Sequence, residues 1–265
     1  MVGTNFRFRI IPVLEEAIVS ESVPLVEYIS FHVDKPQLFQ SLLKQLPCMP
    51  QSAKHLKRIK NSEILVQPSS SPLPAHLLMG LAHRVTTAKV MVPAVKPCTR
   101  KQFEWAKRYW PVCFHPVKEV EAMLDGSFIN DEEYSHIIGM SERAETIGNG
   151  QHGCVITDSE HKVVAESGAS SDVLGHAVML AVTFLCEKSR NSSTDAVSYL
   201  GTGCDVFLTN EPCAMCAMAL VHFRVSRVFF GQPTVKGGAL QSSWRLQEET
   251  QLNHHYRVFR VDEIC

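Results

Sequence analysis

Three side chains in the second half of the chain have the types and spacing of a metal site. His176 stands alone, whereas Cys213 and Cys216 form a C-x-x-C pair directly after Glu211-Pro212. An imidazole and two thiolates suit zinc, and a site with three protein ligands leaves the fourth position for water. The sequence therefore predicts a zinc site of the catalytic type. The alternative is a redox-active cysteine pair beside an unrelated histidine, and it gives His176 no role.

The residue two positions after His176 decides what chemistry such a site supports. Zinc deaminases share the signature H-x-E followed by P-C-x-x-C, in which zinc activates a water molecule and the glutamate carries its proton. This chain has Val178 at the glutamate position. Because valine has no titratable group, it cannot act as a general acid or base. Glu211 is the acid beside the Pro-Cys turn, and we do not expect it to reach the position of the missing glutamate.

All three ligands are expected at the N-termini of helices. The pattern predicts a helix from Asp172 to about Ser189 with His176 in its first turn, and a helix over 213–223 with both cysteines in its first turn. Pro212 fits the start of the second helix because its missing N–H would be unpaired there. Free N–H groups at a helix N-terminus lower the pKa of thiols, and the thiolate is the form that binds zinc.

Strands and helices alternate through the rest of this half of the chain. Asn130 is expected to cap a helix that runs to about residue 147. Helices placed between strands imply a largely buried sheet with helices on both faces, which is an α/β fold. The expected strands are 152–157, 162–166, 204–209, 225–230 and 256–261.

The first half has the pattern of a small α+β domain. Helical segments begin at Pro36 and after Thr99, which is a good N-cap residue. The order β-α-β-β-α is compatible with a ferredoxin-like domain. The expected strands are 24–33, 55–66 with a break at Asn61-Ser62, 85–92, and a further candidate at 112–117.

The charge distribution also divides the chain into two parts. Residues 1–125 carry 16 Lys and Arg against 10 Asp and Glu, a net charge of +6, whereas residues 126–265 carry 10 against 17, a net charge of −7. We therefore expect a basic domain over 1–125 and a zinc-binding domain over 126–265. A basic domain favours a polyanionic partner such as RNA, although a charge of this size also falls within ordinary surface variation.

Two groups of basic residues in the first domain are candidates for tRNA binding. Cations contact phosphates, and neighbouring aromatic rings can stack on unpaired bases. The alternative is that the cations form a solvated face and the aromatic rings face the core. The candidates are Lys54, Lys57, Arg58 and Lys60 in one segment, and Lys101, Lys107 and Arg108 in another.

The nine cysteines are widely scattered, and the first ten residues lack the apolar segment of a secretory leader. No run of about 18 apolar residues occurs, so we expect neither a membrane span nor a membrane partner. These features indicate a reducing compartment, in which a C-x-x-C pair binds metal more readily than it forms a disulfide. We expect a cytoplasmic and nuclear location.

The second half resembles a known family. The run LTNEPCAMCAMALVH at 208–222, with Gly237-Gly238-Ala239-Leu240 and Leu252-Asn253-His254, resembles the tRNA adenosine deaminases of the cytidine deaminase-like superfamily. With Val178 in place of glutamate and a basic N-terminal extension, the chain resembles above all the non-catalytic subunits of the eukaryotic heterodimeric enzyme. That enzyme converts adenosine to inosine at the tRNA wobble position.

The resemblance covers about 130–265 closely and the first half only weakly. It implies a three-layer α/β/α domain with a mixed five-stranded sheet, a bound Zn²⁺, a homologous catalytic partner subunit that retains the glutamate, and a tRNA substrate. Active relatives use an asparagine after the second strand to hold the target nucleotide, and the segment from Ala165 to Gly175 contains none.

Two other functions stay open at this point. One is a free-standing zinc deaminase with a displaced general base, and the other is a zinc-stabilised RNA-binding module. A zinc that is purely structural prefers a fourth protein ligand. Cys265, through its thiolate or its terminal carboxylate, is the first candidate for that ligand, and His254 is the second.

Overall fold

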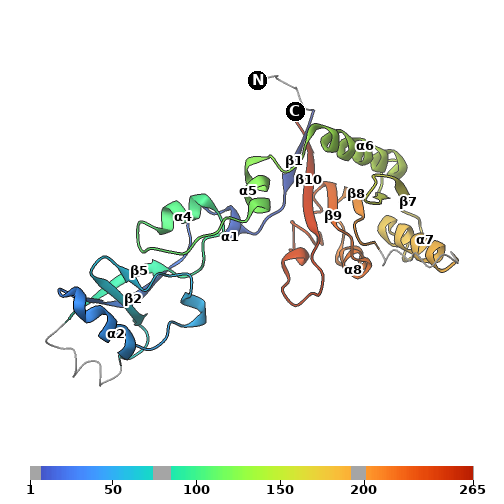
Figure 1. Cartoon of the computed structure of the whole chain (residues 1–265). Coiled ribbons are helices and arrows are strands. Elements are labelled where there is room, and N and C mark those ends of the chain that lie inside the picture. The colour runs from blue at the N-terminus through green and yellow to red at the C-terminus, as the bar shows by residue number, and fades with distance from the viewer. Residues whose placement is uncertain (1–6, 74–84, 192–200, 265) are drawn as a thin grey trace. The chain divides into compact units, whose positions relative to one another are not determined.

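The structure is a computed structural model that describes residues 7–73, 85–191 and 201–264. It divides into two compact units, one of Met1–Glu15 with Ile129–Cys265 and the other of Glu16–Phe128 (Figure 1). The division differs from the expected domains 1–125 and 126–265, because the first strand of the chain belongs to the same unit as Ile129–Cys265. No helix within the described ranges has both the length and the apolar character needed to cross a membrane.

The larger unit is built on a mixed sheet of six strands in the order β1-β10-β9-β8-β6-β7. Strand β9 is parallel to β8 and β10, and the remaining neighbours are antiparallel. The strands are β1 (Phe8–Pro12), β6 (Gly153–Thr157), β7 (Val163–Gly168), β8 (Asp205–Asn210), β9 (Arg227–Gln232) and β10 (Arg257–Glu263).

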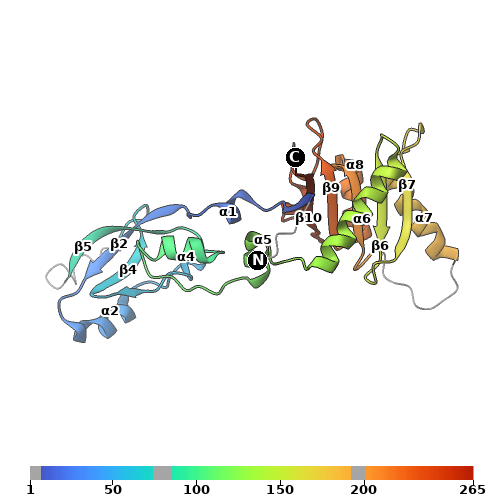
Figure 2. The same cartoon turned by 90° about the horizontal axis from the view of Figure 1, so that it is seen from above.

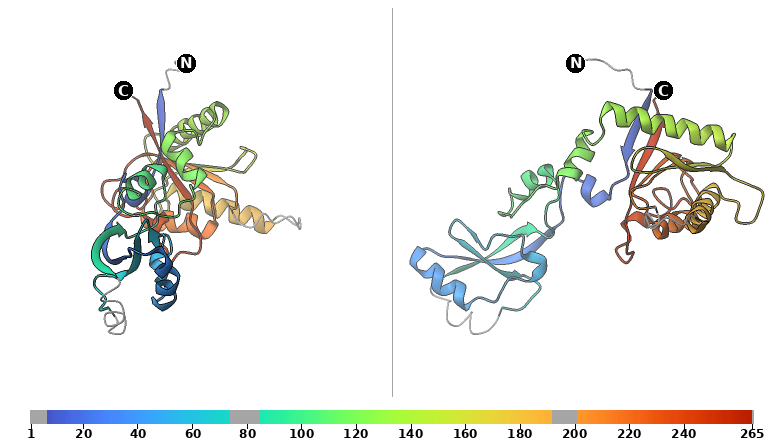
Figure 3. Two further views of the ribbon diagram at one scale, coloured as in Figure 1. Left: turned by 60° about the vertical axis from the view of Figure 1, so that its left-hand side comes forward. Right: turned by 45° about the vertical axis from the view of Figure 1, so that its right-hand side comes forward.

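Strand β1 corrects the expectation of a five-stranded sheet. It runs antiparallel along β10, with Phe8 opposite Glu263 and Pro12 opposite Phe259, so the two strands lie side by side (Figure 3). Phe8 and Ile10 alternate with exposed Arg7 and Arg9 in this segment, which is the pattern of a half-buried strand. The two ends of the chain are therefore joined in one sheet.

Helices cover both faces of this sheet, as expected for a three-layer α/β/α domain. Helix α6 lies on one face, and α7 and α8 lie on the other (Figure 2). Between the sheet and α7–α8 is an apolar core that includes Val206, Val228 and Val258. On the opposite face three phenylalanine rings from neighbouring strands stack with centroids 5.0 Å apart. The helices are α6 (Asp131–Gly148), α7 (Ala177–Asn191) and α8 (Ala214–Phe223).

Helix α6 is fixed at its start by a cap and an ion-pair network. The side chain of Asn130 accepts a hydrogen bond of 2.8 Å from the Glu133 backbone N–H, which confirms the predicted N-cap. Arg227 donates to both carboxylate oxygens of Asp205, at 2.9 and 2.5 Å, and also to Glu133. Because Asp205 begins β8 and Arg227 begins β9, the network ties the helix to the middle of the sheet.

The smaller unit holds a four-stranded sheet in the order β3-β4-β2-β5, in which all neighbouring strands are antiparallel. One apolar cluster packs α2 on one face of this sheet, and a second packs α4 on the other. The elements are α1 (Glu16–Val19), β2 (Leu25–His32), α2 (Phe39–Gln45), β3 (Ile59–Lys60), β4 (Glu63–Pro68), β5 (Thr86–Pro93), α4 (Arg100–Ala106) and α5 (Lys118–Asp125).

This strand order is compatible with a ferredoxin-like domain, and that assignment stays a prediction because part of the connection between β4 and β5 lies outside the described residues. Asn61 has a positive φ of 50° at the expected break between β3 and β4. Thr99 caps α4 by accepting from the Gln102 N–H, as predicted. The expected strand at 112–117 does not form, since this segment contributes only a single bridge between Val112 and Leu56.

Candidate metal centre

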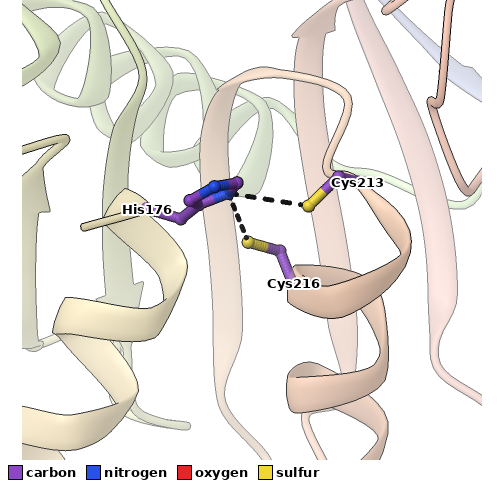
Figure 4. A group of neighbouring side chains, drawn as sticks. All are labelled: His176, Cys213 and Cys216. Carbon is purple, nitrogen blue, oxygen red and sulfur yellow. Dashed lines mark hydrogen bonds between the residues drawn. The ribbon is translucent and has the colours of Figure 1, made fainter. Parts of the chain in front are cut away.

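The structure brings the three predicted metal ligands together, as Figure 4 shows. The Nδ1 atom of His176 lies 3.6 Å from Sγ of Cys213 and 3.5 Å from Sγ of Cys216. Zn–S and Zn–N bonds of ordinary length at a tetrahedral angle would place sulfur and nitrogen about 3.6 Å apart. All three ligand atoms lie within 4.8 Å of one another. The donor set and its spacing therefore fit a zinc ion.

Two helix N-termini carry these side chains. Cys213 is the N-cap residue of α8, so it precedes the helix, and Cys216 lies in the first turn. His176 comes directly before α7, where its carbonyl accepts the first helical hydrogen bond from Leu180 N–H at 3.1 Å. A Cβ on the preceding Gly175 would lie 2.2 Å from Oγ of Ser170, so only glycine fits there. Packing at Gly175 thus fixes where the turn that carries His176 begins.

The Cys216 thiol is less acidic than its place at a helix N-terminus alone would predict. Burial, followed by the neighbouring Cys213, raises the pKa of the Cys216 thiol to about 12. In the metal-free chain this thiol therefore keeps its proton at neutral pH. A metal ion that binds here has to displace the proton, which couples metal affinity to pH.

Val178 lies in the apolar core rather than in solvent. Its side chain is 5% exposed and packs in the cluster that also holds Cys216 and Ala181. It also lines a cavity of about 350 Å³ beside the three ligands. The cavity is further bounded by Gly175, Leu208, Asn210 and Thr234 among others. A cavity therefore lies next to the metal ligands, and an apolar side chain occupies the position at which a zinc deaminase has its catalytic glutamate.

Glu211 cannot act as a displaced general base, because its carboxylate is fully engaged. It is 2% exposed. Burial alone would raise the pKa of this carboxyl, but hydrogen bonds from Ser242, Gln241 and Leu240 outweigh burial and lower the pKa. A general base works best with a pKa near the operating pH. Glu211 is therefore a structural carboxylate, a role that the sequence pattern alone did not reveal.

Of the two expected fourth ligands, only His254 lies among the described residues, and it does not join the site. Within that part, the metal-type cluster contains His176, Cys213 and Cys216 and no further His, Cys, Asp or Glu. Nε2 of His254 instead pairs with the carbonyl of Val225 at 2.7 Å, which argues against its role as a ligand. Cys265 lies outside the described residues, so its role stays a prediction.

In the smaller unit the first basic group lies beside the segment that directly follows Lys107 and Arg108 of the second group. The Lys57 N–H donates to Pro111 at 2.9 Å, and Nε1 of Trp110 donates to the Lys57 carbonyl at 2.7 Å. Lys60 reaches across to the Tyr109 carbonyl at 2.8 Å, with its Nζ 5.4 Å above the Trp110 ring. Residues 54–60 and 109–113 therefore run beside each other.

The candidate basic side chains differ in whether they already have a hydrogen-bond or ion-pair partner within the protein. Arg58 donates to the Pro47 carbonyl, Lys101 pairs with Glu21 at 3.1 Å, and Lys107 pairs with Glu104. By contrast, the exposed side chains of Lys54, Lys57 and Arg108 have no hydrogen-bond or ion-pair partner among the described residues.

Most of the nearby aromatic rings face the core, as the alternative interpretation held. Trp110 is fully buried, and Tyr109 is 37% exposed. Phe103 and Trp105 pack against the same apolar cluster as Trp110. Of these four rings, only that of Tyr109 is exposed enough to stack on a base.

The α/β/α fold, the His-Cys-Cys cluster and the cavity beside it are typical of a deaminase-type domain with a candidate zinc site. Residues 130–232 match the family model described as the cytidine and deoxycytidylate deaminase zinc-binding region. A solved structure from a study of A-to-I editing by tRNA:A34 deaminases is 26% identical, covers 48% of this chain and 98% of that chain, and aligns with a TM-score of 0.39.

Relatives match over most of the chain. A mouse protein named "Probable inactive tRNA-specific adenosine deaminase-like protein 3" is 30% identical over 322 residues, which cover 98% of this chain and 91% of the mouse protein. The yeast "tRNA-specific adenosine deaminase subunit TAD3" from Saccharomyces cerevisiae is 31% identical over 187 residues, covering 64% of this chain and 58% of the yeast protein. The chain belongs to the family of tRNA-specific adenosine deaminase-like protein 3.

Proposed function

We propose that the chain is the non-catalytic subunit of a tRNA adenosine deaminase that forms inosine at the wobble position. One observation carries the proposal: buried Val178 occupies the H-x-E glutamate position while His176, Cys213 and Cys216 keep the geometry of a zinc site. The names of relatives support it, since one is called probable inactive and another is called a subunit. A partner that retains the glutamate would carry out the proton transfers.

The zinc in this chain then has a structural role. His176 would link the start of α7 to Cys213 and Cys216 at the start of α8. A zinc ion held in this way cross-links two helices and stabilises the fold by several kcal/mol. Loss of the catalytic glutamate does not remove this contribution, which explains why the ligands persist beside a valine.

The partner is a homologous catalytic deaminase subunit, and the substrate is tRNA. Lys54, Lys57 and Arg108 are exposed cations of the smaller unit, and they support a contact with the phosphates of tRNA. Holding a substrate by surfaces remote from the reacting atoms raises the rate without adding chemistry. We further propose that the complex acts in the cytoplasm and the nucleus.

Co-expression tests this function directly. The chain is produced together with a homologous deaminase that retains H-x-E, and the complex is analysed by size-exclusion chromatography with mass determination. A stable complex with equal amounts of the two chains supports the proposal. If the chain elutes alone and binds RNA without such a partner, the zinc-stabilised RNA-binding module is the better account.

A further inference from the structure

We propose that Glu211 is a positioning residue for the metal centre, which it holds by clamping the loop from Pro233 to Arg245 onto the turn that carries Cys213. The inference rests on the zinc assignment of the proposed function. It adds a residue that is not a ligand and assigns a purpose to the Gly-Gly loop that follows β9.

The Glu211 carboxylate gathers most of this loop around itself. One oxygen, Oε1, accepts backbone N–H groups from Leu240, Gln241 and Ser242 at 2.9, 2.6 and 2.9 Å. The other oxygen, Oε2, accepts the Thr234 N–H at 3.1 Å and the Ser242 hydroxyl. Successive N–H groups that converge on one oxygen form an anion-binding nest. Here the anion is a side chain of the protein itself.

The same loop is paired directly with the metal-binding turn. The Ala239 N–H donates to the Pro212 carbonyl at 2.9 Å, and Gly238 forms a β-bridge with Cys213. The position of Cys213 Sγ therefore depends on the loop, and the loop depends on Glu211. The Glu211 carboxylate holds the Leu240 N–H, the neighbouring Ala239 N–H holds the Pro212 carbonyl, and Pro212 directly precedes the ligand Cys213.

The glycines of the loop are explained by this clamp. A Cβ on Gly238 would lie 2.4 Å from Oε2 of Glu211, and Gly237 has a φ of +87° that side chains rarely adopt. A residue with a side chain at either position would push the loop off the carboxylate or strain the turn. Glu211, Gly237 and Gly238 therefore act as one structural unit.

The clamp makes the whole loop responsive to the metal. Val235 is 83% exposed and Trp244 is 60% exposed, and both lie in the loop whose inner part is held by Glu211. If a metal ion fixes Cys213, the bridge to Gly238 and the bond to Ala239 become more persistent, because both partners are then held. Metal binding should therefore slow hydrogen exchange at the loop amides that donate to Glu211.

The test is made on the full-length chain with Glu211→Gln, Ser242→Ala and the exposed control Glu187→Gln. Zinc affinity is measured by competition with a chromophoric chelator, and hydrogen exchange is followed over 233–245 with and without zinc. Glu211→Gln should weaken zinc binding by about 10–100-fold, the usual effect of removing a group that orients a ligand. The zinc-dependent protection of 240–242 should also disappear, whereas Glu187→Gln should match the parent.

Ser242→Ala keeps the charge and all of the backbone donors, so it should fold even if Glu211→Gln does not, and it should show a smaller loss in the same direction. Parental zinc affinity and parental zinc-dependent protection in both variants would overturn the inference while leaving the proposed function intact. If the parent chain binds no zinc, the zinc assignment in the proposed function is wrong, and this inference fails with it.

Discussion

The side chains of Val178 and Cys216 pack in one apolar cluster, with 5% and 3% of their surfaces exposed. The position that a deaminase gives to its proton carrier is thus part of the core behind the metal ligands. Restoring an acid there is the most direct challenge to the non-catalytic assignment.

Val178→Glu should not produce an active enzyme from the isolated chain. The new carboxylate would enter an apolar cluster, and the segment from Ala165 to Gly175 contains no asparagine to hold the target nucleotide. We expect no inosine above the level of the parent chain and a loss of about 1–3 kcal/mol in the free energy of unfolding. Val178→Gln is the control, because glutamine matches glutamate in size but carries no charge. It separates the effect of burying a polar group from that of adding an acid. Inosine formation by Val178→Glu alone, near the rate of a catalytic deaminase, would show that the base-binding pocket is intact.

Removing a thiol ligand should release the metal and destabilise the larger unit. Cys216→Ser is expected to lower the zinc content from about one per chain to near zero and to lower the thermal midpoint by several degrees. Dialysis of the parent against a chelator should give the same shift. Cys48→Ser is the control, since Cys48 is exposed in the smaller unit. An unchanged midpoint after zinc removal would mean that the metal adds nothing to the fold.

Charge reversal at a single lysine, Lys54→Glu or Lys57→Glu, should weaken tRNA binding by the heterodimer. Because each phosphate contact releases condensed counterions, the slope of log affinity against log salt concentration should become shallower by about one per lost contact. The matched control is Lys44→Glu, since Lys44 is an exposed lysine on α2 that is not among the tRNA-binding candidates. Fluorescence anisotropy with labelled tRNA across a salt series measures both quantities. Equal effects of the test and control substitutions would mean that the net charge of the unit, and not a phosphate contact at Lys54 or Lys57, determines the affinity.

Arg227 should matter for stability far more than other arginines that form ion pairs. Its side chain is 15% exposed and that of Asp205 is 6% exposed, so Arg227→Met leaves a buried carboxylate without its partner. The expected loss is about 3–5 kcal/mol in the free energy of unfolding, measured in urea. The control Arg143→Met breaks an exposed pair with Glu166 and should cost less than about 1 kcal/mol. Similar losses in the two variants would contradict the burial argument.

The parts of the site that depend on local sequence could be predicted. The C-x-x-C spacing after Pro212 places two thiols at the start of one helix, and the caps Thr99 and Asn130 mark two other helix starts correctly. Each of these features is decided by residues within one turn of the chain. The replacement of the H-x-E glutamate by Val178 is likewise visible at a single position of the sequence.

Features that depend on distant contacts could not be predicted. Strand β1 pairs with β10 at the other end of the chain, and five residues carry too weak a pattern to reveal that partner. The role of Glu211 depends on a loop that begins more than twenty residues later. The thiol pKa of Cys216 was expected to fall at a helix N-terminus, and burial reverses the direction.

Inosine formation at the wobble position of a tRNA transcript tests the central claim most directly. The assay compares the purified chain alone, an H-x-E deaminase partner alone, and the purified complex of the two. We predict no inosine from the chain alone and far more inosine from the complex than from the partner alone. Inosine produced by the chain alone, and abolished by His176→Ala, would contradict the non-catalytic assignment of Val178.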